Sequence, residues 1–138
     1  MASKVYPKGI QAIMRSTAHL QDGSVKLVPV DGNFVFDAAN EFYTDISASV
    51  AAGCAGITLS APLVSVVGTQ VKFDADDANL LWDSVNDPDD LEGAVVYYDT
   101  GDTATSFLIA FLDSVTFVTN GSDVFATLNA SGIFGGNT

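Results

Sequence analysis

The chain has 138 residues, 48% of them hydrophobic and 16% charged, which excludes disorder and fits one domain with a substantial core. Seventeen Asp and Glu against five Lys and Arg give a net charge of −12, and residues 73–138 hold twelve of the acids and no Lys or Arg. This surface excludes nucleic acid as a main partner and disfavours an anionic membrane, because both are bound largely through Lys and Arg.

The N-terminal segment predicts a short helix. In "YPKGIQAIM" (residues 6–14), Ile10 and Met14 are four residues apart on one helical face. Pro7 fits the first turn, where no backbone donor is needed. The same N-terminus lacks an apolar run long enough for the centre of a signal peptide, so we expect synthesis in a reducing cytoplasm.

A strand and a hairpin are predicted next. "SVKLVPV" (residues 24–30) is typical of a strand, and Pro29 favours a sheet edge because it removes a ladder donor. Asp31-Gly32 is a hairpin turn signal, with "NFVF" (residues 33–36) as the returning strand.

Residues 36–53, "FDAANEFYTDISASVAAG", predict a second helix. Phe42, Ile46 and Val50 recur at four-residue spacing, and Asp37 is suited to cap the start. Gly53 and Gly56, on either side of Cys54, end this helical pattern.

From residue 57 onward the chain predicts a sheet. Turn signals at Gly68-Thr69 and Asn120-Gly121 separate short β-prone runs. Two runs, "AVVYY" and "SFLIAFL", do not alternate, so we expect both of their faces to be buried, against the core or another subunit. The runs are "ITLS", "LVSVV", "QVKF", "AVVYY", "SFLIAFL", "SVTFV" and "VFATLN".

The predicted fold class is mainly β: a β-sandwich or barrel of short antiparallel strands with one or two short helices. Residues 1–138 are expected to form a single domain. The Gly-rich end, residues 130–138, is expected to be a flexible or partner-ordered tail.

The stretch "FDADDANLLWDSVNDPDDLEG" (residues 73–93) is the strongest candidate for a metal site. An EF-hand is rejected, because counting from Asp74 or from Asp87 leaves the required glycine and glutamate positions unfilled. Another calcium site remains open, since calcium accepts six to eight oxygens in flexible arrangements. Solvated acids in a strand and turn segment are the favoured interpretation. The candidate ligands are Asp74, Asp76 and Asp77, or Asp87, Asp89 and Asp90.

Catalytic candidates are few. A carboxylate pair drawn from Asp76, Asp77, Asp89 and Asp90 could run glycoside hydrolysis, but seventeen acids make such a pairing uninformative. Trp82 is interpreted as a core or interface anchor, with Phe73 also pointing inward.

Nucleophilic catalysis is weaker still. His19 is the sole histidine and Cys54 the sole cysteine, and no orienting motif accompanies either one. A surface histidine and a small buried cysteine are the default interpretations. We therefore predict no enzymatic activity, no catalytic residue and no cofactor.

The order of several segments resembles a family of small virion structural proteins of tailed bacteriophages, over roughly residues 4–113. The segments are "KVYPKGIQAIM", "SVKLVPVDGNFVFDAANEFYTDI", "GITLSAPLVSV", "VKFDADDANLLWDSV" and "GAVVYYDTGDTATSFLIAFLD".

This resemblance implies a capsid decoration (cement) protein that docks on the major capsid protein lattice, made in the host bacterial cytoplasm and located in the virion. A tail or neck component, contacting its neighbouring subunits, is the alternative. A calcium-dependent β binding module is a second alternative, and a homo-oligomer is expected in the leading interpretation.

Overall fold

Antiparallel β-strands are the main secondary structure of this computed structural model, which confirms the predicted mainly β class. The structure describes residues 3–15, 24–51, 54–68, 70–76, 81–82, 91–112, 116–119, 124–127 and 134–137. The described strands form one five-stranded and two three-stranded sheets. In chain order the elements are β1 (Ser3–Val5), α1 (Pro7–Met14), β2 (Val25–Asp31), the 3-10 helices η1 (Tyr43–Asp45) and η2 (Ser47–Ser49), β3 (Ile57–Thr58), β4 (Ser60–Val67), β5 (Gln70–Asp76), β6 (Leu81–Trp82), β7 (Leu91–Tyr98), β8 (Phe107–Leu112), β9 (Thr116–Thr119), β10 (Val124–Thr127) and β11 (Phe134–Asn137).

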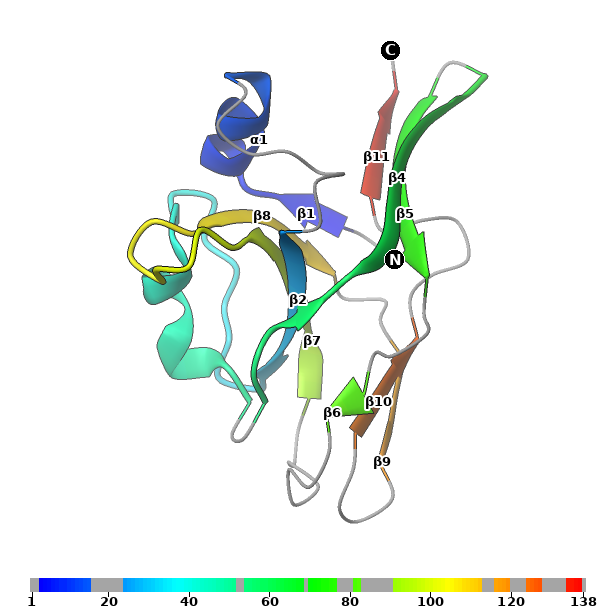
Figure 1. Cartoon of the computed structure of the whole chain (residues 1–138). Coiled ribbons are helices and arrows are strands. Elements are labelled where there is room, and N and C mark those ends of the chain that lie inside the picture. The colour runs from blue at the N-terminus through cyan, green and yellow to red at the C-terminus, as the bar shows by residue number, and fades with distance from the viewer. Residues whose placement is uncertain are drawn as a thin grey trace.

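The five-stranded sheet has the order β1-β8-β7-β2-β3, with β7 at its centre. Residues 94–96 of β7 and 108–110 of β8 are fully buried, which confirms that these non-alternating runs are covered on both faces. Described parts of this same chain supply the cover, so the burial needs no second subunit. This sheet is the core of the molecule (Figure 1).

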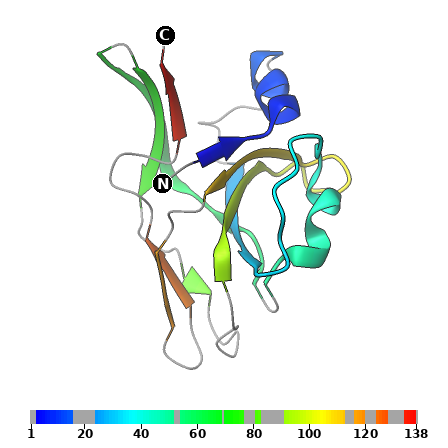
Figure 2. The same cartoon turned by 180° about the vertical axis from the view of Figure 1, so that it is seen from behind.

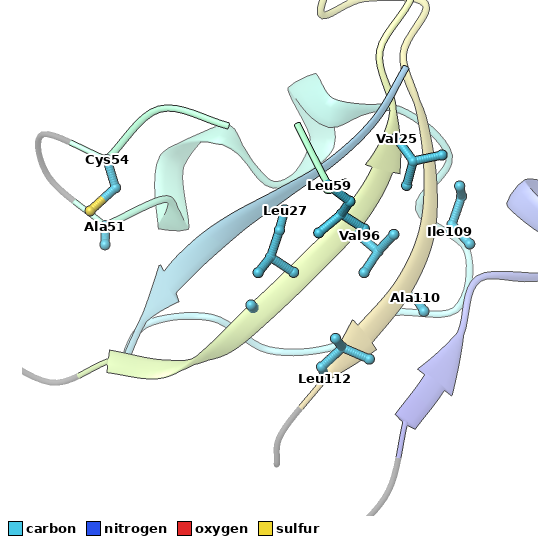
Figure 3. Close-up of a cluster of buried hydrophobic side chains, with 10 residues drawn as sticks. Val25, Leu27, Ala51, Cys54, Leu59, Val96, Ile109, Ala110 and Leu112 are labelled. Atoms are coloured by element: carbon cyan, nitrogen blue, oxygen red, sulfur yellow. The ribbon is translucent and has the colours of Figure 1, made fainter. Parts of the chain in front are cut away.

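Two clusters of buried side chains share β2, β7 and β8 but contain alternating residues of β7, as expected for opposite faces of a pleated sheet. Ala94 and Val96 belong to one cluster, Val95 and Tyr97 to the other. Leu59 completes the first cluster and lies beside Leu27 and Val96 in Figure 3.

Helix α1 confirms the predicted first helix, with Pro7 at its first positions. The face that carries Ile10 and Met14 is not the one closest to the sheet, because Met14 is 81% exposed whereas Gly9 and Ala12 are buried. The reason is steric: a Cβ on Gly9 would overlap the carbonyl oxygen of Leu108 in β8. The helix therefore approaches the sheet through its smallest residues.

The predicted helix over residues 36–53 was wrong, since its described part, residues 36–51, contains only the single turns η1 and η2. Phe42 and Val50 each make a β-bridge, to Phe107 and Val30. Asp37 caps no helix; its carboxylate accepts the Ala39 N–H in a local turn. These bridges to the sheet hold the segment in a non-helical path, although its apolar residues recur at helical spacing.

Residues 33–36 do not form the predicted returning strand. Strand β7 pairs with β2 along the whole length of β2, and β3 pairs with part of the opposite edge of β2. The segment instead covers the sheet, with the Phe34 ring centroid 4.7 Å from that of Phe111 and the Phe36 centroid 4.8 Å from that of Tyr6. Val35, between them, is 80% exposed.

Pro29 does not place β2 at the edge of the sheet, as the sequence predicted, because β2 lies between β7 and β3. However, β3 pairs only with Lys26 and Leu27 and ends before Pro29. The Pro29 carbonyl accepts the Ala51 N–H on that side. The missing donor therefore falls beyond the end of β3, and no ladder bond is lost.

Two of the three predicted hairpins, those at Gly68-Thr69 and Asn120-Gly121, are confirmed by strand pairing, whereas the one at Asp31-Gly32 lacks its returning strand. Val67 pairs with Gln70 across the turn at Gly68, whose φ is +62°, and Thr119 pairs with Val124 in the β9–β10 pair. The smaller sheets have the orders β11-β5-β4 and β6-β10-β9. Figures 1 and 2 show them on the same side of the five-stranded sheet.

The end of the chain contributes β11, which pairs with β5 through residues 134–137. The flexible or partner-ordered tail over residues 130–138 stays a prediction, as does the single domain. No helix within the described ranges is long and apolar enough to cross a membrane.

Candidate functional site

The predicted metal ligands fall only partly within the described residues. Asp74 and Asp76 lie in β5, where their backbones pair with Leu63 and Ser60 of β4. Two residues apart in a strand, they occupy the same face of the sheet. The other candidate ligands, Asp77, Asp87, Asp89 and Asp90, lie outside the described residues.

Elsewhere, the described part of the chain contains no cluster of three or more His, Cys, Asp or Glu suited to a metal. The calcium-dependent module and the carboxylate-pair hydrolase both depend on acids outside that part. They remain predictions. The indole of Trp82 and the ring of Phe73 also lie outside what is described; only their backbones are placed, in β6 and β5.

Cys54 lies in the first core cluster and is only 6% exposed. Burial raises the pKa of its thiol, because the low-dielectric surroundings disfavour the thiolate. A reactive cysteine needs the thiolate and access, and Cys54 is poor in both. The possible partner His19 lies outside the described residues, so its distance from Cys54 is not defined.

A polar cluster that was not predicted from the sequence joins Lys26 of β2 to the loop between β7 and β8, residues 99–106. The Nζ atom of Lys26 lies 2.7 Å from Oδ2 of Asp99, and both side chains are less than one third exposed. The other carboxylate oxygen, Oδ1, accepts the Gly101 N–H at 2.9 Å. These hydrogen bonds, first from Lys26 and then from Gly101, lower the pKa of Asp99.

Ser106 completes this cluster, and its hydroxyl is fully engaged. It is completely buried, donates to the Asp102 carbonyl at 2.9 Å and accepts the Thr100 N–H at 3.1 Å. The Ser106 hydroxyl also lies 3.4 Å from Oδ1 of Asp99, but a nucleophilic serine needs an approach for substrate as well as a base, and the burial of Ser106 removes that approach. The cluster therefore holds the loop at residues 99–106 and presents no activated nucleophile.

Tyr6 and Tyr97 pack against the segment 34–46, which itself contributes Tyr43, and burial raises the pKa of all three phenols. The Tyr43 and Tyr97 rings contact each other with centroids 4.8 Å apart and planes tilted by 56°, and the Tyr6 hydroxyl is buried with no described hydrogen-bond partner. The phenols are therefore neutral well above physiological pH. Their contacts are those of core residues.

Exposed apolar side chains are the remaining unusual feature. Val66 is 73% exposed and Val64 37% exposed, and both lie on β4. Separated by two residues, they occupy one face of the sheet. The register places Val71 and Phe73 of β5 at positions opposite them, and Phe134 of β11 opposite Phe73. Apolar residue types thus occupy one face of three neighbouring strands.

This face belongs to a part of the chain without acidic residues. No Asp or Glu occurs between Asp45 and Asp74, and Lys72 is the only charged residue in that interval. The β4–β5 hairpin is therefore close to neutral in a protein of net charge −12. The gap in acidic residues and the alternation around Ser65 are the sequence signals that could have identified it.

We define the β4–β5 face as the positions Val64, Val66, Val71 and Phe73. Its root is fixed to the core, because Leu59, just before β4, is buried and donates its N–H to the Val25 carbonyl at 2.9 Å. From there the hairpin extends away from the five-stranded sheet (Figures 1 and 2). The arrangement presents an apolar surface on an anchored arm.

Comparison with protein-family models, with curated proteins and with solved structures finds no match.

Proposed function

We propose that this chain is a structural protein of a tailed-bacteriophage virion. As a decoration (cement) protein it docks as an oligomer on the lattice of the major capsid protein and stabilises the head. It is made in the host bacterial cytoplasm and located in the virion. The role needs no catalytic group, cofactor, nucleic acid or membrane.

The assignment to a virion rests on the sequence resemblance over residues 4–113. The observation that carries the oligomeric part of the role is the β4–β5 face, where Val66 is 73% exposed on an arm anchored by Leu59. Exposed apolar side chains grouped on one face of a strand, as Val64 and Val66 are, are typical of protein contact sites. Isolated exposed apolar residues such as Val35 and Met14 are common on monomers and carry less weight.

The polar cluster around Asp99 is consistent with a structural role. Its hydrogen bonds join Asp99 to Lys26, Gly101 and Ser106, and they join the Ser106 hydroxyl to the backbone of Thr100 and Asp102. A connected network of this kind fixes a loop. Rigid loops between core strands suit a protein that must keep its shape on a particle.

The charge also fits an exterior position on a particle that contains DNA. A protein with net charge −12 is repelled by phosphate, so it gains nothing from contact with packaged DNA. Apolar docking supplies the attraction, while the acidic residues face solvent or a basic patch of the lattice.

The test is high-resolution imaging of a virion that carries this protein, together with co-sedimentation of the purified protein with assembled capsids. We expect density for the chain at regular positions on the head and saturable binding to capsids lacking it. Density confined to the tail or neck would replace decoration with the alternative placement. Absence from virions, or failure to bind capsids, would refute the proposal.

A further inference from the structure

The β11-β5-β4 sheet lacks a covering layer among the described elements. Its three strands pack mainly on one another and make only slight contact with the other described elements. A sheet with an apolar face is stable only when that face is covered by another layer. Val66 and Val64 remain exposed even with the whole chain present. A layer from outside the chain would complete this arrangement.

Charge indicates what that layer is. A basic partner would be attracted to the acid-rich residues 74–138, not to a neutral hairpin. A copy of the chain carries the same charge of −12, so it can approach closely only where acidic residues are absent. Residues 46–73 are such a region, and they include β4 and most of β5.

We propose that the β4–β5 face is the self-association surface of this protein, covered by the same face of a second copy. Two identical faces related by a two-fold axis form a self-complementary contact, with the sheets about 10 Å apart as in a β-sandwich. Val66 lies within the contact on both copies. This inference deepens the oligomerisation included in the proposed function and specifies its surface.

The experiment compares two valines that are exposed to a similar extent. Val66→Asp places a charge in the contact on both copies, whereas Val35→Asp makes the same change on a loop outside it. Light scattering coupled to size exclusion measures the mass as a function of concentration. We expect the wild type and Val35→Asp to form dimers, and Val66→Asp to dissociate at least roughly tenfold more readily, because an unpaired carboxylate would be buried twice.

Salt gives an independent readout. Screening reduces the repulsion between two chains of net charge −12, so self-association through a neutral face should strengthen as salt is added. Association of acidic residues with a basic patch should weaken instead. Val66→Ser, which removes apolar surface without adding charge, serves as the milder variant. Far-ultraviolet circular dichroism and thermal melting check that each variant is folded.

A wild type that stays monomeric at every concentration overturns the inference, as does a dimer that Val66→Asp and Val66→Ser leave intact. Equal weakening by Val66→Asp and Val35→Asp would also refute it. Capsid binding is measured separately on the same samples. If the dimer forms through Val66 but does not bind capsids, the proposed function fails and the self-association surface stands.

Discussion

Lys26 and Asp99 join two separate parts of the fold through a contact of 2.7 Å between Nζ and Oδ2. Lys26 is in β2, and Asp99 begins the loop after β7, where its Oδ1 also accepts the Gly101 N–H. The two side chains are mostly buried, so solvent screens their attraction less than at an exposed surface pair. The contact thus fixes the loop that contains Ser106 to the central sheet.

Asp99→Asn should lower the free energy of unfolding at neutral pH by about 1–2 kcal/mol, since it removes the charged acceptor of Lys26. The pKa of Asp99 is lowered in the folded protein, so its stabilisation is present above the unfolded pKa and is lost as the pH falls through the folded pKa. The difference between wild type and variant should therefore shrink on acidification. Denaturant unfolding across acidic and neutral pH measures both effects.

Asp102→Asn is the matched control for this prediction. The Asp102 carboxylate accepts a hydrogen bond from the Ala104 N–H, which an asparagine oxygen can also accept. We expect a change below about 0.5 kcal/mol. An equal loss in both variants would contradict a specific role for the Lys26 contact.

Gly9→Ala should destabilise the protein, although alanine favours helices by about 1 kcal/mol over glycine. The added Cβ would overlap the Leu108 carbonyl and push α1 away from β8, at a net cost of about 1–3 kcal/mol. Thermal or denaturant melting measures the change. Gln11→Ala, on the exposed side of the same helix, should be nearly neutral. A more stable Gly9→Ala variant would refute the close approach.

Phe34→Ala should lower the free energy of unfolding by about 3–5 kcal/mol, because it removes a buried ring packed on Phe111. The neighbouring Val35→Ala should change it by less than about 0.5 kcal/mol, because Val35 is exposed. Equilibrium unfolding of both variants measures the contrast between the two neighbours. Similar losses in the two variants would contradict the burial of Phe34 against Phe111.

The Cys54 thiol should react slowly with a thiol reagent in the native protein and quickly after denaturation, with native rates at least roughly tenfold lower. It is buried, and burial raises its pKa, so both access and thiolate formation are limited. Absorbance of the released chromophore follows the reaction. Rapid labelling of the folded chain would indicate an accessible cysteine and reopen the possibility of a nucleophile.

Local patterns were enough to predict much of the fold. The apolar runs around Val95 and Ile109 indicated strands covered on both faces, and both are central in the sheet. Pro7 marked a helix start and Gly68 a tight turn. These signals are reliable because they depend on residues close in sequence: burial of a continuous apolar run, a fixed φ, or a positive φ.

The candidate surface was only partly visible in the sequence. The strand containing Val66 was predicted, but its exposure was not, because alternating residues look alike whether a face is covered or open. The acidic stretch over residues 73–93 was the predicted candidate for a metal site. The exposed valines of the candidate surface instead lie in the interval before it, residues 46–73, which contains no Asp or Glu. The cluster at Lys26 and Asp99 joins residues far apart in the chain, so no local motif indicated it.

By itself, the sequence determined the β class, the presence of the central strands and the separation of neutral from acidic segments. Tertiary structure decided which face of α1 meets the sheet, why residues 36–53 form two short turns, and which side of the β4–β5 hairpin remains open. The physical reason is that periodicity shows which residues can share a face. What covers that face depends on partners distant in the chain, such as Leu108 beneath Gly9.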